Sequence, residues 1–412
     1  MTDSSAPIAR GPVVEPRWSD LRMATSGRLA HAWDTEDLRR IARRRLPRLI
    51  FDYVDGGGEN EITLNRNVTA FDRIGFRPRT VAEIDGRTQS VSFFGRGSAA
   101  PFGIGPMGGL GFLWPDADII AARLAAKAGI PHVLASGASN SIEQVAAAAP
   151  EARRWFQLYV FRDPGLNRRL LERAAAAGCE ALVVTTDTQI NAKRTRDFRN
   201  GFELPMRFTP RTVYDFARRP RWLWKVARRH SSSAMGNMMS EIGPNPTAAK
   251  AVEFFRTERS RSVGWEELKI LRDLWKRPML IKGIVTAEET AGAVALGADG
   301  VVVSNHGGRN LDGTVATIDA LPEVVAAASG RLTVLLDSGV RKGSDVVKAL
   351  ALGARCCLIG RPVAFALAAA GEAGVEHVLA MIHDEIDRVQ GLLGITRMDQ
   401  LDPSFVRLDA HP

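Results

Sequence analysis

The chain has 412 residues, of which 45% are hydrophobic and 25% are charged, the mixture of an ordinary globular protein. This composition excludes a disordered chain, a coiled coil and a collagen-like fibre. Lysine and arginine number 55 against 46 aspartate and glutamate, so the formal charge of +9 suits anionic metabolites, nucleic acid or anionic lipid without choosing among them.

Cysteine usage and the apolar runs restrict where the protein works. Cys179, Cys356 and Cys357 are too few for a disulfide scaffold, and none has metal-ligand spacing because adjacent strand residues point to opposite faces. We therefore expect a reducing compartment and no metal site. No apolar run at the N-terminus resembles a signal peptide, and residues 363–370 fall short of the roughly 20 that a spanning helix needs. The sequence predicts a cytoplasmic protein that at most lies on the inner face of a membrane.

The chain begins with two segments of different character. Residues 1–33 are rich in Pro, Ser and Arg without a period, and they predict a flexible leader. At Asp34 or Thr35, either of which can cap, a helical pattern begins, with an apolar stripe on one face. The stripe consists of Leu38, Ile41, Leu46, Ile50 and Tyr53. The three glycines at 56–58 end this predicted helix.

From residue 101 onward, short apolar runs alternate with Ala-rich helical stretches that tend to end in Gly. The eight runs cover residues 101–106, 131–135, 154–159, 181–186, 278–283, 300–304, 332–337 and 355–360. Each leads directly into polar or Gly-rich loop residues, which favours an α/β fold, the (β/α)8 TIM barrel. A doubly wound open sheet is the less favoured alternative, because no GxGxxG motif follows the first run. We expect one barrel domain over 34–400 and a tail at 401–412.

One connection breaks the alternation. About 90 residues separate the fourth run from the fifth, far more than a usual loop, and we assign 207–262 to an insert. Its residues 211–230 carry six Arg and one Lys against a single Asp, together with Trp222 and Trp224. This composition suits a helix on anionic lipid, and it suits equally a lid with a solvated basic face. No RNA-binding motif accompanies the basic segment, so we expect no nucleic-acid partner.

The active site of such a barrel lies at the C-terminal ends of the strands, so the residues after each run are candidates. His306, two glycines and Arg309 follow the sixth run and offer a base, close backbone approach and a fixed cation in one loop. After the fourth run, Asp187 can orient and charge-stabilise an imidazole, and Arg194 can grip an anionic substrate. Taken alone, Asp187 and Arg194 would also fit a helix cap and a solvated charge.

The remaining run ends point to a cofactor. Lys282 lies inside an otherwise apolar run, where an unpaired charge is costly, so it could form a Schiff base or lie near an electron-rich cofactor ring. The last two runs end in Asp337 to Arg341 and in Gly360-Arg361. Glycine backbone with arginine at these places is similar to the phosphate site that barrels build after strands seven and eight. Surface salt bridges are the alternative for these two arginines.

Taken together, these residues resemble the FMN-dependent 2-hydroxy-acid oxidising family, which includes glycolate oxidase, lactate oxidase, and the bacterial lactate and mandelate dehydrogenases. The strongest motif is SNHGGRNLDG at 304–313, close to the family's SNHGGRQLD. Further matches follow in order: LPRLIFDYVDGGGEN, WFQLYV, VVTTD, LIKGI, LLDSGVRKGSDVVKALALGA and IGRP. The resemblance spans about 34–400 and implies oxidation of an (S)-2-hydroxy acid, mandelate- or lactate-like, to the 2-oxo acid. A homo-oligomer, a tetramer, is expected with it.

The resemblance also implies a role for each matching residue. His306 is the base that removes a substrate proton as electrons pass to flavin N5, and Asp187 stabilises the imidazolium. Arg309 and Arg194 hold the substrate carboxylate, with help from Tyr53. Substrate contacts are further implied for Tyr159 and Gly108, and FMN contacts for Pro106, Met107, Gly108, Ser136, Gln157, Thr185, Lys282, Ser304, Asp337, Gly339, Arg341, Gly360 and Arg361. In this scheme Lys282 lies near flavin N1 and O2, and the set from Asp337 onward holds the ribityl phosphate.

Two departures from the family pattern bear on function. Gly108 stands where oxidase members usually carry Ala, and with the nearby LWP segment it resembles the dehydrogenases, which favours a quinone-type acceptor. The alternative is an oxidase that uses oxygen and makes hydrogen peroxide. Asn310 replaces the usual Gln after Arg309. A branch that matures the peptide-derived cofactor mycofactocin shares the NLDG ending and an RWLWK segment, but Arg309 favours a carboxylate substrate over that alternative.

Overall fold

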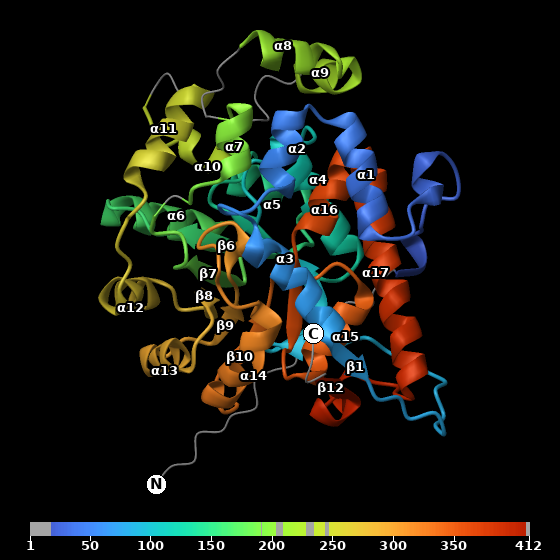
Figure 1. Ribbon diagram of the computed structural model, residues 1–412. Helices are drawn as coiled ribbons and strands as arrows, with labels where there is room; N and C mark the ends of the chain where they lie inside the picture. Colours follow the sequence, from blue (N-terminus) through green and yellow to red (C-terminus); the bar gives the residue numbers. More distant parts are fainter. Residues whose placement is uncertain (1–17, 191, 203–208, 228–234, 244–246, 409–412) are drawn as a thin grey trace.

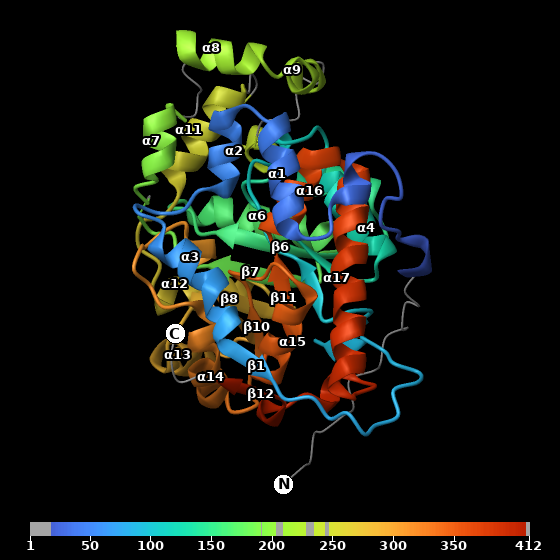
Figure 2. The ribbon, with the colours of Figure 1, turned by 45° about the vertical axis from the view of Figure 1, so that its right-hand side comes forward.

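The computed structural model describes residues 18–190, 192–202, 209–227, 235–243 and 247–408. Its centre is a closed barrel of eight parallel strands (Figures 1 and 2). In chain order these are β4 (Phe102–Ile104), β5 (Pro131–Ala135), β6 (Arg153–Tyr159), β7 (Ala181–Thr185), β8 (Met279–Ile284), β9 (Gly300–Val303), β10 (Thr333–Leu336) and β11 (Cys356–Ile359). Pairing of β11 with β4, with Ile359 opposite Ile104, closes the ring. All eight strands coincide with the predicted runs, and the TIM-barrel prediction is confirmed.

Helices surround the barrel, which explains why the strands read as continuous apolar runs rather than alternating ones. Every residue of β9 is buried, as is every residue of β11. The outer helices are α4 (Ala117–Lys127), α5 (Ile142–Ala148), α6 (Pro164–Ala176), α12 (Trp265–Leu274), α13 (Ala287–Leu296), α14 (Thr317–Ala328), α15 (Gly343–Ala351) and α16 (Arg361–Ala370). A long helix, α17 (Glu372–Leu393), packs against α16 and α15.

The predicted first helix is two helices. Asp34 caps α1 (Thr35–Arg45) by accepting a hydrogen bond from the Asp37 amide at 2.7 Å, and α2 (Arg48–Asp55) follows. The prediction of one helix is wrong because Pro47 has no N–H, and a residue before proline is forced out of the helical region. Leu46 accordingly has ψ 150°. The break lets α2 turn across the barrel mouth.

Both ends of the described chain pack on the barrel rather than extending away from it. Of the predicted leader, residues 1–17 lie outside the described residues, whereas Trp18 stacks on His383 of α17 at 4.1 Å. The Ala24 amide donates to His377 Nδ1 at 2.9 Å. From Trp18 onward the predicted flexible leader therefore differs from the structure. At the other end, β12 (Val406–Leu408) pairs with β1 (Ile74–Phe76), beyond α3 (Ile62–Thr69).

The insert forms short helices that gather with α2 at one end of the barrel (Figures 1 and 2). They are α8 (Pro210–Ala217), α9 (Pro220–Ala227), α10 (Gly236–Met239) and α11 (Ala248–Glu258), and α7 (Thr195–Asn200) precedes the insert at the same end. Trp222 faces inward, donating from Nε1 to the Phe112 carbonyl at 3.0 Å and stacking on Phe216. Its neighbour Trp224 is 57% exposed. No helix among the described residues is long and apolar enough to cross a membrane.

Candidate active site

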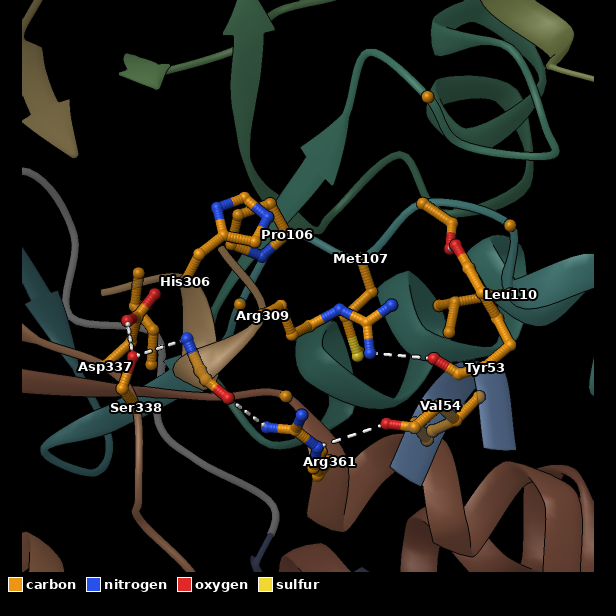
Figure 3. A pocket seen from close by; sticks show the side chains of 18 of the residues that line it. Tyr53, Val54, Pro106, Met107, Leu110, His306, Arg309, Asp337, Ser338 and Arg361 are labelled. Atoms are coloured by element: carbon orange, nitrogen blue, oxygen red, sulfur yellow. Dashed lines mark hydrogen bonds between the residues drawn. The ribbon is translucent and has the colours of Figure 1, made fainter. Parts of the chain in front are cut away.

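A single pocket gathers residues from the C-terminal ends of the strands, from α2 and from the insert (Figure 3). The predicted site residues that line it are Tyr53, Pro106, Met107, Gly108, Tyr159, Arg194, Lys282, His306, Arg309, Asp337, Gly339, Arg341, Gly360 and Arg361. The fold thus brings together residues that lie up to about 300 positions apart, because parallel strands all end at the same rim.

His306 is held as a neutral base at this rim. Its Nδ1 lies 2.9 Å from Asp187 Oδ1, and its Nε2 lies 3.4 Å from the Tyr159 hydroxyl. Because a carboxylate only accepts, Nδ1 carries the proton and the Nε2 lone pair faces the pocket. Burial lowers the pKa of His306 below its usual value, although Asp187 opposes this. Burial works to raise the pKa of Asp187, but His306 and Lys282 outweigh it and the pKa falls.

Arg309 and Arg194 lie on the α2 side of the pocket. Arg309 Nη1 donates to the carbonyls of Tyr53 at 2.7 Å and Gly56 at 3.0 Å, at the C-terminal end of α2. These are helix-end carbonyls without a partner in the helix, and their partial negative charge favours a cation. Arg194 Nε lies 3.5 Å from the Arg309 carbonyl. Burial and the neighbouring Arg194 lower the pKa of Arg309 to about 10.

Lys282 is buried as an ammonium. Its Nζ donates to Ser304 Oγ at 2.7 Å and lies 3.1 Å from Asp337 Oδ2. Burial would lower the pKa of Lys282, but Asp337 and Asp187 reverse the effect and raise it. A charged lysine is no nucleophile, so the Schiff-base interpretation loses support and a place beside an electron-rich ring gains it.

Glycines and arginines from the last two strands form the far wall of the pocket. Gly339 has φ +90°, and a Cβ there would lie 2.1 Å from the Asn67 carbonyl, so only glycine fits. Burial lowers the pKa of Arg341 to about 10. Arg361 reaches toward the end of α2, donating to the carbonyl of Val54 at 3.1 Å (Figure 3). It also donates to the Gly56 carbonyl at 2.9 Å. It thereby joins Arg309 in capping α2, a contact that the sequence did not predict.

Five predicted residues do not line the pocket: Ser136, Gln157, Thr185, Asp187 and Ser304. Asp187 and Ser304 hydrogen-bond to residues that do line it, His306 and Lys282. Gln157 Nε2 donates to Thr185 Oγ1 at 2.9 Å, and Ser136 Oγ accepts from the Tyr159 amide at 3.2 Å. Gln157 Oε1 is buried without a hydrogen-bond partner among the described residues.

Sequence reasoning missed the wall that the insert supplies. Met235, Val252, Phe255 and Arg259 all line the pocket. The Phe255 ring meets the Tyr159 ring edge-on at 5.7 Å. These four residues lie outside every motif quoted from the sequence, so no signal singled them out.

The residues present fit an FMN group. In the described part of the chain, the guanidinium groups of Arg309, Arg341 and Arg361 donate hydrogen bonds only to neutral backbone carbonyls. Enclosed cations of this kind are stabilised by an anionic partner such as a phosphate or a carboxylate. The unpartnered Gln157 Oε1 is an acceptor for a ring N–H, and Lys282 supplies a positive charge nearby. The described residues contain no cluster that could hold a metal ion.

Comparison with known proteins gives consistent matches over almost the whole chain. The model of the FMN-dependent dehydrogenase family matches residues 42–408. The chain is 37% identical to (S)-mandelate dehydrogenase of Pseudomonas putida, covering 91% of this chain and 94% of that protein. It is 42% identical to L-lactate dehydrogenase of Caulobacter vibrioides, covering 90% and 97%.

Solved structures match the chain over a similar extent. A crystal structure of the monotopic membrane protein (S)-mandelate dehydrogenase superimposes with a TM-score of 0.87 at 37% identity, covering 92% of this chain and 99% of that one. A mandelate oxidase structure gives a TM-score of 0.76 at 36% identity, covering 90% and 97%.

Proposed function

This chain is an enzyme of the FMN-dependent dehydrogenase family that oxidises 2-hydroxy acids with FMN as its cofactor, and we propose that its substrate is an (S)-2-hydroxy acid with His306 as the base. The observation that carries the proposal is the His306–Asp187 pair, with His306 lining one pocket together with Arg309, Arg194 and Tyr159. A base beside two guanidinium groups is what a carboxylate-bearing substrate needs.

The chain's own residues would act in the following way. Arg309 and Arg194 bind the substrate carboxylate and neutralise its charge, which makes a neighbouring proton easier to remove. Tyr53 assists this binding, and Tyr159 contacts the substrate hydroxyl beside His306 Nε2. His306 takes a substrate proton, and Asp187 stabilises the resulting imidazolium.

When bound, FMN supplies the acceptor for the two electrons that leave the substrate. We propose that Lys282 holds positive charge against its ring. Hydrogen bonds to the ring would come from Gln157, Thr185 and Ser136, and from the backbone at 106–108. Asp337, Gly339, Arg341, Gly360 and Arg361 would surround its phosphate.

Anaerobic mixing with a panel of (S)- and (R)-2-hydroxy acids tests the substrate class. We expect bleaching of the flavin absorption by one or more (S)-acids, and none by the matching (R)-acids. Purified protein whose flavin no 2-hydroxy acid bleaches would contradict the proposal. Extraction and mass determination of the cofactor provide the control that FMN is present.

The proposed electron acceptor is a quinone rather than oxygen. Gly108 supports this, because oxidase members of the family usually carry Ala at this position and Gly resembles the dehydrogenases. A Cβ at Gly108 would lie 3.2 Å from the Gly137 carbonyl, so the backbone here leaves little space for Ala. After bleaching, re-oxidation should be fast with a soluble quinone analogue and slow with oxygen. Hydrogen peroxide formed at the rate of turnover would assign the enzyme to the oxidase alternative instead.

We further propose that the insert docks the protein on an anionic membrane surface, where a quinone would dissolve. Exposed apolar side chains on α8 and α9 support this, namely Val213, Tyr214, Leu223 and Trp224. The similar (S)-mandelate dehydrogenase is described as a monotopic membrane protein. We also propose that residues 34–400 form one barrel domain, that the protein is a tetramer, and that it lies at the inner face of the cell membrane.

A further inference from the structure

The insert contributes a third arginine to the substrate end of the pocket. Arg259 follows the last residue of α11 and lines the same cavity as His306, Arg194 and Arg309. The carboxylate of a 2-hydroxy acid already has two guanidinium groups in the proposed function, so Arg259 requires another explanation.

Backbone pairing fixes where Arg259 stands. Its segment runs antiparallel to the chain that leaves β6, with Arg259 opposite Phe161. The Arg162 amide donates to the Glu258 carbonyl at 2.8 Å, and the Ser260 amide donates to the Val160 carbonyl at 2.8 Å. Because both neighbours of Arg259 are hydrogen-bonded to the residues that directly follow β6, Arg259 is held close to the C-terminal end of that strand.

The side chain lies one aromatic ring away from the proposed base. Its guanidinium carbon is 5.7 Å from the centroid of the Tyr159 ring, whose hydroxyl is 3.4 Å from His306 Nε2. Phe255, one helical turn earlier on α11, contacts the same ring edge-on. With Met235 and Val252 also at the pocket, the wall formed by the insert is apolar apart from Arg259.

Charge makes this position informative. Burial lowers the pKa of Arg259, and the nearby Arg194 and Arg261 lower it further, while Tyr159 opposes them. An anionic group bound between Arg194 and Arg259 would offset the repulsion between these two guanidinium groups. Arg194 is proposed to serve the carboxylate next to the reacting carbon, so the group for Arg259 belongs to the other end of the substrate.

We propose that Arg259 is a specificity-determining residue that binds a second carboxylate, carried on the substituent of the 2-hydroxy acid. The apolar side chains of Phe255, Met235 and Val252 contact the spacer between the two acid groups. The substrate class is therefore a 2-hydroxy diacid with an apolar or aromatic spacer. This inference rests on the proposed function and refines its substrate.

Matched substrate pairs test the inference. Each pair shares one skeleton and differs only in that the distal group is a carboxylate or its uncharged amide: (S)-2-hydroxyglutarate with its 5-amide, and (S)-4-carboxymandelate with its 4-amide. Anaerobic flavin reduction gives kcat/KM for the native chain, for Arg259→Gln and for Arg259→Lys. Arg256→Gln is the control, because Arg256 is exposed on the same helix and pairs with Glu253.

The native chain should favour the diacid of at least one pair by roughly tenfold or more. Arg259→Gln should remove that preference by lowering kcat/KM for the diacid about 10- to 100-fold, the range for one charge-assisted contact, with little change for the amide. Arg259→Lys should retain part of the preference, and Arg256→Gln all of it. Equal losses for diacid and amide in Arg259→Gln would overturn the inference, because Arg259 would then only position Tyr159.

A binding measurement makes the test independent of turnover. The 2-oxo diacid and its amide perturb the flavin spectrum when they bind, and their dissociation constants should show the same preference and the same loss. A native chain that binds and oxidises amides as well as diacids would overturn this inference and leave the proposed function standing. If no hydroxy acid of either kind bleaches the flavin, the proposed function itself fails.

Discussion

His306 occupies a left-handed backbone conformation, φ 58°, which few residues with a side chain adopt. Gly307 and Gly308 follow at φ 67° and 69°, so three consecutive residues turn the chain sharply at the end of β9. The His306 amide donates to Ser304 Oγ at 3.1 Å, and the Gly307 amide to Ser338 Oγ at 2.8 Å. Strain of this kind persists only where the surroundings impose it, and here it aims the imidazole into the pocket.

Replacing the base should separate chemistry from cofactor binding. We expect His306→Ala to retain FMN, because the proposed phosphate wall is formed by other strands, and to reduce it with substrate at least about 10²-fold more slowly. Stopped-flow flavin reduction measures the rate, and absorbance ratios measure cofactor content. A variant that reduces FMN at a near-native rate would refute the proposed role of His306.

The pH profile should report the lowered pKa of His306. Only the neutral imidazole accepts a proton, so kcat/KM for flavin reduction should fall as pH decreases through this pKa, with the midpoint below 6.5. Asp187 raises the pKa of His306, so Asp187→Asn should move the midpoint to still lower pH while lowering the plateau rate. A midpoint that stays fixed in Asp187→Asn would contradict this coupling.

Arg309→Lys tests the geometry of carboxylate binding. A lysine keeps the charge but cannot donate to a carboxylate through two parallel N–H groups, so KM should rise about tenfold or more with a smaller change in kcat. Steady-state kinetics with a quinone analogue measure both constants. The substitution also removes the hydrogen bonds from Arg309 to the Tyr53 and Gly56 carbonyls, so thermal unfolding is measured as a control. A large fall in Tm would indicate damage to α2 rather than to substrate binding.

At the residue scale, the sequence predicted those side chains whose position follows from a strand end. His306, Asp187 and Lys282 come directly after or within apolar runs, and the barrel rule alone brings them together. The barrel rule could not predict Arg259 or Phe255. These two residues reach the pocket only because the insert folds back beside the end of β6.

At the scale of elements, α2 and α7 are clamped together beside the substrate end of the pocket. Arg196 on α7 donates to Asp55 at 2.7 Å and also pairs with Glu61, while Asp55 pairs with Arg39 of α1. Burial works against ionisation of Asp55, but the two arginines outweigh it and lower its pKa. The clamp fixes Tyr53 of α2 relative to Arg194, the residue before α7.

Arg196→Met should therefore act on substrate binding through position. Removing one partner of Asp55 should destabilise the fold by about 1–3 kcal/mol and raise KM severalfold, with little change in the pH midpoint of flavin reduction. Arg199→Met is the matched control, an exposed arginine on the same helix. Equal KM values for the two variants would show that the clamp does not position Arg194.

Element boundaries were predictable where one local rule decides them. Asp34, one of the two predicted caps, is the residue that caps α1, because its side chain accepts a hydrogen bond from a free helix amide. The break at Pro47 follows from the same kind of rule, but the apolar stripe continues through it in the sequence and suggested one helix. Periodicity and proline chemistry conflict at this point, and the covalent constraint of proline prevails.

At the scale of the whole molecule, the barrel was predictable and the arrangement of the insert was not. Strands that are buried on both faces appear in the sequence as continuous apolar runs, which can be recognised. By contrast, α8 and α9 are held by individual contacts such as the hydrogen bond from Trp222 to Phe112. Trp222 and Trp224 look alike in the sequence and have opposite surroundings in the structure. The structure is therefore compatible with both interpretations of the insert, because Trp222 packs inward as in a lid and Trp224 lies on an exposed face as in a membrane-binding helix.

The exposed face predicts binding to anionic membranes. Leu223 and Trp224 are 42% and 57% exposed, and Arg221 of the same helix is exposed as well. Each cation near an anionic leaflet contributes on the order of 1 kcal/mol, and tryptophan favours the headgroup zone. We expect the full chain to float with vesicles containing phosphatidylserine at low salt, to dissociate as salt increases, and to lose binding when residues 211–246 are replaced by a Gly/Ser linker.

A double variant distinguishes this face from a general effect of surface hydrophobicity. Leu223→Ser with Trp224→Ser should weaken flotation at least about tenfold, because both side chains leave the proposed contact zone while Trp222 stays packed on the Phe112 carbonyl. Leu392→Ser is the control, since Leu392 is 74% exposed on α17, outside the insert. Native protein that remains unbound to anionic vesicles at low salt would leave only the lid role for α8 and α9, and the quinone would then have to reach the pocket from solution.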